Sequence, residues 1–185
     1  MRSCGRIRLL AIQPTEHAVL FPEDIQILSE QVLARARARS LTMATAESCT
    51  GGLVAAALTA IAGSSDVVKG GVVSYANSAK MGLLGVELQV LDQYGAVSEP
   101  VARAMAEGAL VRLQADLAVS ITGVAGPGGG TAEKPVGLVH FATALRGGPT
   151  LARERRFGEL GREGVRLSAL RTALELLQIR LADES

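Results

Sequence analysis

Aromatic residues are scarce in this sequence: they make up 3% of its 185 residues, and tryptophan is absent. Proteins that bind single-stranded nucleic acid stack the bases on aromatic side chains, which this chain supplies in very small number. Basic residues are not in excess either, because 19 Lys and Arg face 18 Asp and Glu for a net charge of +1. Since a protein that binds the phosphate backbone usually shows a clear basic excess, we expect no nucleic-acid partner.

Cysteine, histidine and long apolar runs are also sparse. The two cysteines are Cys4 and Cys49 and the two histidines are His17 and His140, and none stands near another in the sequence. This spacing supports neither a zinc site nor a disulfide framework, so we expect no metal and a reducing, cytoplasmic environment. No apolar run approaches the length of a membrane span, and the run at 9–12 is too short for a signal peptide. We therefore expect no membrane partner.

Hydrophobic residues, at 48%, are sufficient for the core of one domain. Residues 1–20 show no period and are predicted to form a loose N-terminal tail, followed by a single domain over residues 21–185. Short apolar stretches predict strands, and apolar residues at helical spacing predict helices. Strands are expected at 41–46, 67–75, 116–121, 136–144 and 151–157. Helices are expected from about 22, at 53–61, from Asn77, at 98–114 and at 160–182. Asn77 and Ser98 are predicted to be helix caps.

The order of these elements predicts an α/β fold. Strands alternate with helices except in the final pair, so we expect a three-layer α/β/α sandwich whose mixed sheet is mostly parallel with one antiparallel strand. Ligands of such sheets lie at the carboxyl ends of the strands. Ser48, Tyr75 and Thr122 all fall at predicted strand ends and are the first candidates for a functional site.

Ser48 lies where the first predicted strand turns into a helix. The backbone N–H groups of Cys49, Thr50 and Gly51 follow it, and free N–H groups at a helix start could hold the oxyanion of an attacked carbonyl. The alternative is that Ser48 is only a helix cap, which is a frequent role for serine.

A serine nucleophile needs a base. His140 lies inside an apolar strand and His17 in the tail, so a Ser-His-Asp triad is poorly supported. The chain has three lysines, and Lys80 lies in an apolar helix where burial would keep its amine neutral. Tyr75 could relay a proton or orient the lysine. The alternatives are a solvated surface lysine and a half-buried aromatic residue.

A glycine-rich loop spans residues 123–131. Successive backbone N–H groups in such a loop form a concave binding site for anions, such as the phosphate of a nucleotide. The loop is not a Walker A motif, because no Lys-Ser/Thr pair follows its last glycine, and a strand follows instead of a helix. A flexible surface loop is the alternative. The candidate binding residues in it are Gly126, Gly128, Gly129, Gly130 and Thr131.

Two arginines, Arg162 and Arg166, lie one turn apart in the last predicted helix. Arginine binds phosphate and carboxylate groups well, because its planar guanidinium donates hydrogen bonds in pairs. Pairing with Glu159 and Glu163 on a solvated helix face is the alternative that the sequence favours.

Four ordered motifs closely resemble one family, the CinA C-terminal domain family of competence/damage-inducible proteins. The resemblance covers about residues 22–180 and continues through the later motifs KPVG and GREGVR. The four motifs are TAESCTGG at 45–52, GGVVSYANSAK at 70–80, GAVS at 95–98 and TGVAGPGGGT at 122–131.

This resemblance implies an amidohydrolase that converts nicotinamide mononucleotide and water to nicotinic acid mononucleotide and ammonia in pyridine nucleotide recycling. It implies a catalytic Ser48, a Lys80 base and an assisting Tyr75, with Thr122 and Arg162 around the substrate. No metal or cofactor is implied, and members commonly form homodimers or larger homo-oligomers. Some relatives carry a second, N-terminal domain, and this chain is expected to be the stand-alone form. The alternative is a non-catalytic nucleotide-binding module linked to competence or DNA-damage responses.

Overall fold

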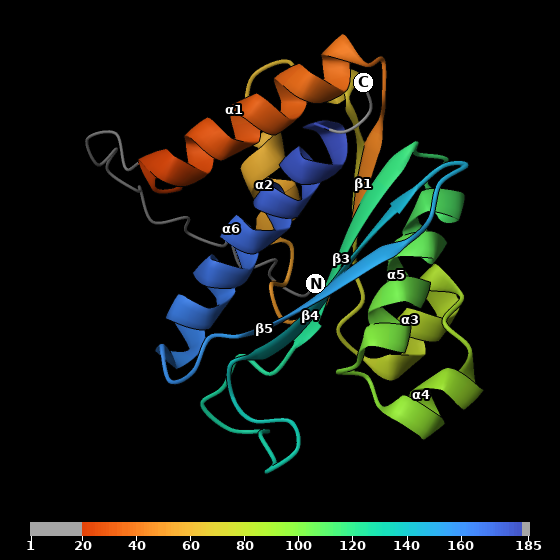
Figure 1. Cartoon of the computed structure of the whole chain (residues 1–185), viewed down its shortest axis with the longest axis vertical. Coiled ribbons are helices and arrows are strands. Elements are labelled where there is room, and N and C mark those ends of the chain that lie inside the picture. The colour runs from red at the N-terminus through yellow and green to blue at the C-terminus, as the bar shows by residue number, and fades with distance from the viewer. Residues whose placement is uncertain (1–19, 183–185) are drawn as a thin grey trace, which may run out of the picture.

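The computed structural model describes residues 20–182, so the predicted tail lies, apart from its last residue, outside the described residues. The strands are β1 (Met43–Glu47), β2 (Val68–Val73), β3 (Leu117–Gly123), β4 (Leu138–Leu145) and β5 (Leu151–Arg156). The helices are α1 (Glu23–Ala38), α2 (Leu53–Thr59), α3 (Asn77–Leu84), α4 (Leu88–Tyr94), α5 (Glu99–Arg112), α6 (Gly161–Ala182) and the short 3-10 helix η1 (Ser64–Asp66) (Figure 1).

The five strands form one sheet in the order β2-β1-β3-β4-β5. Strand β1 pairs in parallel with both β2 and β3, whereas β4 pairs antiparallel with both β3 and β5. Four strands therefore point the same way and β4 alone runs in the opposite direction, which confirms the predicted mixed sheet. Because β1, β2 and β3 are parallel, the residues that follow them meet at one end of the sheet.

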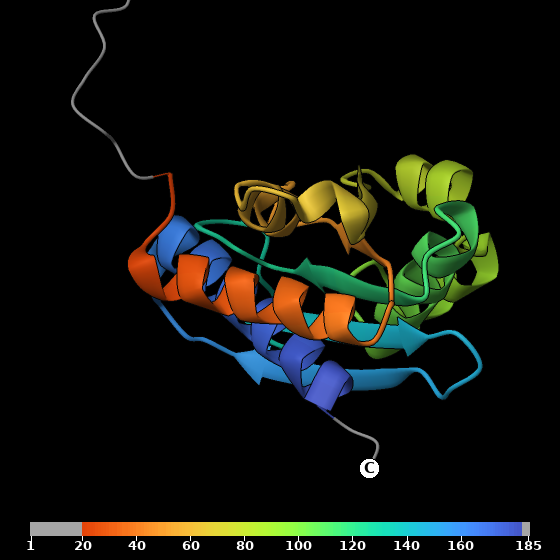
Figure 2. The same ribbon diagram turned by 90° about the horizontal axis from the view of Figure 1, so that it is seen from above.

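Helices cover both faces of the sheet, so the three-layer α/β/α sandwich is also confirmed. Figure 1 shows α1, α2 and α6 on one face and α3, α4 and α5 on the other. Seen from above, α1 and α6 lie side by side along the first face (Figure 2).

The residues of β3 alternate between the two cores, as a strand period of two requires. Leu117, Val119 and Ile121 belong to the core under α1, α2 and α6, whereas Ala118 belongs to the core under α5. Because Ala118 is small, α5 lies close to the centre of the sheet. Strands β1 and β3 are buried along nearly their whole length, so the central strands form a rigid base for the residues that follow them.

Three local predictions were wrong or incomplete. Asn77 is not a cap, because the Lys80 N–H donates to the Ala76 carbonyl and the helix therefore begins one residue earlier, with Ala76 as its N-cap. Ser98 is the N-cap of α5, but its hydroxyl donates to the Gly95 carbonyl rather than capping an N–H group. Helix α4 was not predicted, because seven residues are too few to establish a helical period and only one of their side chains, Leu91, is buried.

Candidate active site

A pocket of about 280 Å³ opens at the carboxyl ends of β1, β2 and β3. Ser48 follows β1 directly, Tyr75 lies two residues after β2, and Thr122 is the last residue but one of β3. The remaining walls come from residues 96–97 before α5, from the glycine loop, and from Arg162 near the start of α6. Among the described residues that line the pocket there is no Asp or Glu, whereas Lys80 and Arg162 are both basic. Because the described lining includes the guanidinium of Arg162 and no carboxylate, it suits a ligand that carries negative charge.

Lys80, on α3, reaches Ser48 through the interior of the molecule. Its Nζ lies 3.0 Å from Ser48 Oγ and donates to the Ser74 carbonyl at 2.6 Å. The Tyr75 carbonyl lies 3.5 Å from the same nitrogen. Lys80 is 1% exposed, so the alternative of a solvated surface lysine is excluded.

Burial also changes the chemical state of this amine. Removal from water disfavours the charged ammonium, so burial lowers the pKa of Lys80 below its ordinary value, and the nearby Cys49 opposes this with a smaller effect. No carboxylate among the described residues forms an ion pair with Lys80 that would restore its charge. A buried amine with a lowered pKa, in contact with a hydroxyl, is suited to act as a general base.

The turn after β1 differs from the prediction. Ser48 is not the cap of α2, because that helix begins at Leu53 with Gly52 as its N-cap. A turn of four residues separates the two, and it needs positive φ angles of 63° at Gly51 and 96° at Gly52, which favour glycine. The Gly51 N–H donates to the Ser48 carbonyl at 3.1 Å, so it is not free.

The backbone N–H groups at the start of α2 are also engaged in hydrogen bonds. The N–H groups of Gly52, Val54 and Ala55 donate to the carboxylate of Glu47, a residue that the sequence analysis did not single out. The positive end of this helix therefore faces Glu47 instead of the pocket. The predicted anion-binding role is left to the N–H groups of Cys49 and Thr50, for which the described residues show no backbone acceptor.

Tyr75 lies at the mouth of the pocket and is 64% exposed. Its hydroxyl accepts from Arg162 Nη2 at 3.4 Å, and Arg162 Nη1 donates to the Gly126 carbonyl at 2.8 Å. The part of Tyr75 that approaches Lys80 is its backbone carbonyl. The structure therefore places the phenol beside Arg162, with its backbone next to the lysine.

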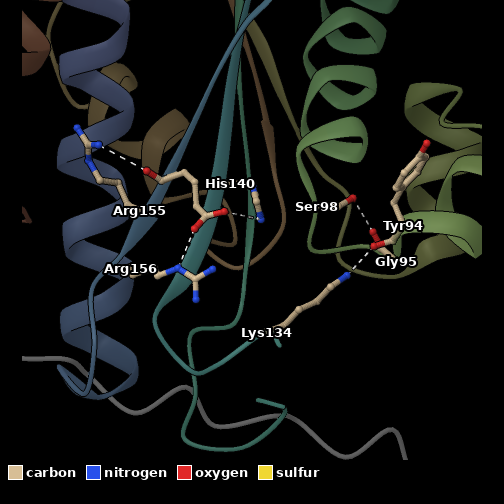
Figure 3. A network of polar contacts seen from close by, with 8 residues as sticks. Tyr94, Gly95, Ser98, Lys134, His140, Arg155 and Arg156 are labelled. Carbon is tan, nitrogen blue, oxygen red and sulfur yellow. Dashed lines mark hydrogen bonds and ion pairs between the residues drawn. The ribbon is translucent and has the colours of Figure 1, made fainter. Parts of the chain in front are cut away.

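Thr122 is buried and lines the pocket, but its hydroxyl donates to the Ala96 carbonyl at 2.7 Å. The carbonyls of the two preceding residues also accept hydrogen bonds from side chains. Ser98 Oγ donates to the Gly95 carbonyl, and Lys134 Nζ donates to the Tyr94 carbonyl (Figure 3). Three successive carbonyls are thus fixed by side chains from three different segments. This network holds the wall at residues 94–97, and the sequence analysis missed the part of Lys134 in it.

The other predicted binding residues divide into two groups. Cys49, Gly126, Gly128 and Gly129 line the pocket, whereas Gly130 and Thr131 border a separate depression beside Arg156. Thr131 Oγ1 accepts from the Lys134 N–H at 3.0 Å. Thr50 and Gly51 do not line the pocket either, and the Thr50 carbonyl accepts from Arg166 at 2.9 Å.

Cys49 is the thiol closest to Ser48 in the sequence, and it is 6% exposed. Burial raises the pKa of the Cys49 thiol to about 11. At pH 7 a thiol of this pKa is ionised in about one molecule in ten thousand, so Cys49 is a poor nucleophile.

Within residues 20–182, no group of three or more His, Cys, Asp and Glu side chains is arranged to hold a metal ion. Over the same residues, no helix is both long and apolar enough to cross a membrane.

The fold and the pocket together define a class of protein, an α/β sandwich with a serine and a buried lysine at the carboxyl ends of parallel strands. Residues 25–181 match the family model of the CinA C-terminal domain. The chain belongs to this family, as its motifs predicted.

Similar proteins support the assignment. The chain is 52% identical over 162 residues to a CinA-like protein of Synechococcus sp. (strain RCC307), a match that covers 87% of this chain and 39% of that protein. It is 53% identical over 163 residues to a CinA-like protein of Mycolicibacterium gilvum, with coverage of 88% and 38%. The chain thus spans about two fifths of the length of these relatives.

Solved structures of similar proteins share the fold along almost their whole length. The competence/damage inducible protein CihA from Agrobacterium tumefaciens has a TM-score of 0.86 and 54% identity, and the match covers 89% of this chain and 99% of that one. A CinA superfamily protein from Klebsiella pneumoniae has a TM-score of 0.81 and 38% identity, with coverage of 85% and 98%.

Proposed function

We propose that this protein is a metal-independent amidohydrolase that releases ammonia from nicotinamide mononucleotide and leaves nicotinic acid mononucleotide. The observation that carries the proposal is the contact of 3.0 Å between Ser48 Oγ and the Nζ of a lysine that is 1% exposed. The substrate follows from the resemblance of the four motifs. The pocket supports it, since its described lining holds the guanidinium of Arg162 and no carboxylate, which suits a phosphate monoester.

In the proposed reaction Lys80 takes the proton of Ser48. The Ser74 carbonyl at 2.6 Å and the Tyr75 carbonyl at 3.5 Å provide acceptors for the two N–H bonds of a neutral amine. Its lone pair is then left for the Ser48 hydroxyl. The positively charged pyridinium ring of the substrate would further oppose protonation of the lysine, because two like charges in one pocket repel.

Ser48 Oγ then attacks the carboxamide carbon, and the carbonyl oxygen gains the negative charge. The N–H groups of Cys49 and Thr50 are the candidate donors to this oxyanion, and one such donor contributes about 3 kcal/mol. Protonated Lys80 returns its proton to the departing nitrogen, so that the C–N bond breaks and ammonia leaves an ester on Ser48. Water then attacks the ester with Lys80 as base, which releases the acid and restores the serine.

The phosphate would bind near the mouth of the pocket. Arg162 is exposed there and is held between Tyr75 and the Gly126 carbonyl, so its remaining N–H groups are available to an anion. Gly128 and Gly129 also line the pocket, and their backbone N–H groups are further candidate donors to the phosphate. Tyr75 is then assigned to orient Arg162 and the substrate, in place of the proton relay considered from the sequence.

The decisive experiment is to measure ammonia release from nicotinamide mononucleotide beside nicotinamide, glutamine and the full dinucleotide. We expect turnover of the mononucleotide and at least a hundredfold lower kcat/KM for nicotinamide, which lacks the phosphate that Arg162 and the loop would bind. Binding of the mononucleotide without any ammonia release would contradict the proposal and favour the alternative, a nucleotide-binding regulatory module.

A further inference from the structure

Glu47 is a carboxylate placed in the interior of the protein. It is the last residue of β1, directly before Ser48, and its exposed fraction is 0%. It does not line the pocket, and no Lys or Arg of residues 20–182 forms an ion pair with it. A buried charge is costly unless other groups replace the water around it.

Four hydrogen-bond donors take the place of water around the Glu47 carboxylate. The N–H groups of Gly52 and Val54 donate to Oε2 at 3.0 and 3.1 Å, and the N–H of Ala55 donates to Oε1 at 2.9 Å. The Thr45 hydroxyl donates to Oε1 at 3.3 Å. Each carboxylate oxygen thus accepts two hydrogen bonds, and the negative charge lies at the positive end of α2.

These bonds fix both ends of the turn that carries Ser48. At one end the Ser48 N–H donates to the Ile121 carbonyl at 2.9 Å, which extends the pairing of β1 with β3. At the other end the Glu47 carboxylate holds Gly52, the N-cap of α2. The direction of Ser48 Oγ toward Lys80 therefore depends on a short turn closed by one side chain.

We propose that Glu47 is a positioning residue, which holds the turn at residues 48–52 so that Ser48 Oγ stays within hydrogen-bond distance of Lys80. This inference rests on the proposed function for its consequence in catalysis. Glu47 touches neither the pocket nor the reacting atoms, so it governs kcat through the placement of the serine, and KM stays nearly constant.

The carboxylate is required for a geometric reason. A glutamine at this position has one oxygen, so its amide nitrogen would face either the pair Gly52 and Val54 or the pair Ala55 and Thr45. The three backbone N–H groups can only donate, whereas the Thr45 hydroxyl can turn and accept from an amide; either orientation of the glutamine therefore leaves at least one backbone N–H facing a donor, with no hydrogen bond. Glu47→Gln therefore opens the turn while the size of the side chain is preserved.

The test combines kinetics with a readout that needs no turnover. In a Cys4→Ser background, alkylation of Cys49 reports whether the turn at 48–52 is open, since this thiol is 6% exposed in the native turn. Burial and, after it, the charge of Glu47 raise the pKa of the Cys49 thiol, so alkylation rates are measured over a pH series and compared per thiolate. Glu47→Gln is expected to lower kcat about thirtyfold or more, to change KM less than threefold and to raise the alkylation rate about tenfold. All rates are measured at a temperature where circular dichroism shows the variants folded.

Asp116→Asn is the matched control. Asp116 also accepts from a backbone N–H and a hydroxyl, both of Thr42, but it lies at the opposite end of the sheet, before β3. It should lower the free energy of unfolding and leave both kcat and Cys49 alkylation within twofold of wild type. If Asp116→Asn changed kcat and alkylation as much as Glu47→Gln, or if Glu47→Gln kept kcat within twofold, the inference would be overturned.

If Glu47→Gln does not fold, Thr45→Val tests the positioning role of Glu47 instead. It removes a single donor at nearly constant volume, so kcat should fall about two- to fivefold with faster Cys49 alkylation. An unchanged alkylation rate in Thr45→Val would contradict the positioning role. If the wild-type protein releases no ammonia, the proposed function fails, while the alkylation rates still test whether Glu47 holds the turn.

Discussion

The side chain of Lys80 has a polar end surrounded by three oxygen atoms, those of Ser48, Ser74 and Tyr75. Its stem passes through the interior, and burial lowers the pKa of its amine. At the scale of single residues, the proposed reaction therefore depends on the proton that Lys80 accepts from Ser48 and later returns. The amine must be neutral to accept the proton of Ser48, and protonated to return it to the leaving nitrogen.

The pH dependence of the reaction follows from this shift. Because the folded pKa of Lys80 is lowered, the neutral base becomes populated below the pH at which an ordinary lysine loses its proton, and kcat/KM should rise with pH until Lys80 is fully neutral. Lys80→Arg places a guanidinium that stays protonated and cannot act as a base, so activity should fall about a thousandfold at every pH. A rate that is independent of pH from 5 to 10 would contradict the assignment of Lys80.

The neighbouring thiol gives a second prediction at this scale. Since burial raises the pKa of Cys49 to about 11, the thiol is neutral at working pH and Cys49→Ala should keep at least half of the wild-type kcat. Ammonia release by the purified variant checks this. A loss as large as that of a Ser48→Ala variant would show that the thiol, and not the hydroxyl, is the nucleophile.

The sequence identified Ser48 and Lys80 as a pair because both lie in specific motifs, and because the histidines are badly placed. It could not decide whether Lys80 is buried, since the sequence of a short helix does not show which of its side chains face the interior. It missed Glu47, because a glutamate at the end of an apolar strand carries no local sign of the four donors that meet it. Three of those donors are backbone N–H groups, which no side-chain pattern reveals.

At the scale of elements, the position of α3 decides where Lys80 lies. Helix α3 packs against α5 at Gly108, where an added Cβ would meet the Leu84 carbonyl oxygen at 2.0 Å. The carbonyl belongs to the last residue of α3, four residues after Lys80. A larger residue at position 108 must therefore move the helix that carries the proposed base.

Gly108→Ala should thus destabilise the protein by about 1–3 kcal/mol through overpacking and should also lower kcat. Gly82→Ala is the matched control in α3, because nothing lies within 4 Å of its added Cβ. This change should leave kcat unaltered and stabilise the helix by about 0.5–1 kcal/mol. Urea unfolding and ammonia release measure both effects, and equal behaviour of the two variants would contradict the packing argument.

The glycine loop gives a second prediction at this scale. Lys134 ties the loop to the wall at residues 94–97 through the Tyr94 carbonyl (Figure 3). Lys134→Met should loosen the mouth of the pocket and raise KM for nicotinamide mononucleotide about three- to tenfold, with kcat changed less. Lys69→Met, on the exposed side of β2, is the control that removes an equal charge. A rise in KM in both variants would point to net charge as the cause.

At the scale of the whole molecule, the alternation of strands and helices was sufficient to predict the layers and the single reversed strand. Strand β4 is reversed because no helix lies between it and either neighbour: it follows β3 through the glycine loop, and a short turn joins it to β5. The order β2-β1-β3-β4-β5 was not predicted. It depends on which faces pack together, such as Ala118 under α5, and these contacts join residues far apart in the sequence.

The same architecture explains why the site residues come from separate motifs. Parallel strands deliver Ser48 and Thr122 to one end of the sheet, and α3 and α6 bring Lys80 and Arg162 to the same pocket. Each of the four motifs therefore contributes residues to the lining of the pocket.

The central claim is that the Ser48 hydroxyl attacks the carboxamide. It is tested most directly by the rate of ammonia release from nicotinamide mononucleotide by Ser48→Ala beside wild type, with both proteins shown to be folded. The account predicts a fall of about a thousandfold or more, because Ser48 Oγ is the hydroxyl of the described pocket lining that contacts the amine of Lys80. A Ser48→Ala protein that keeps more than about a tenth of the wild-type rate would contradict it.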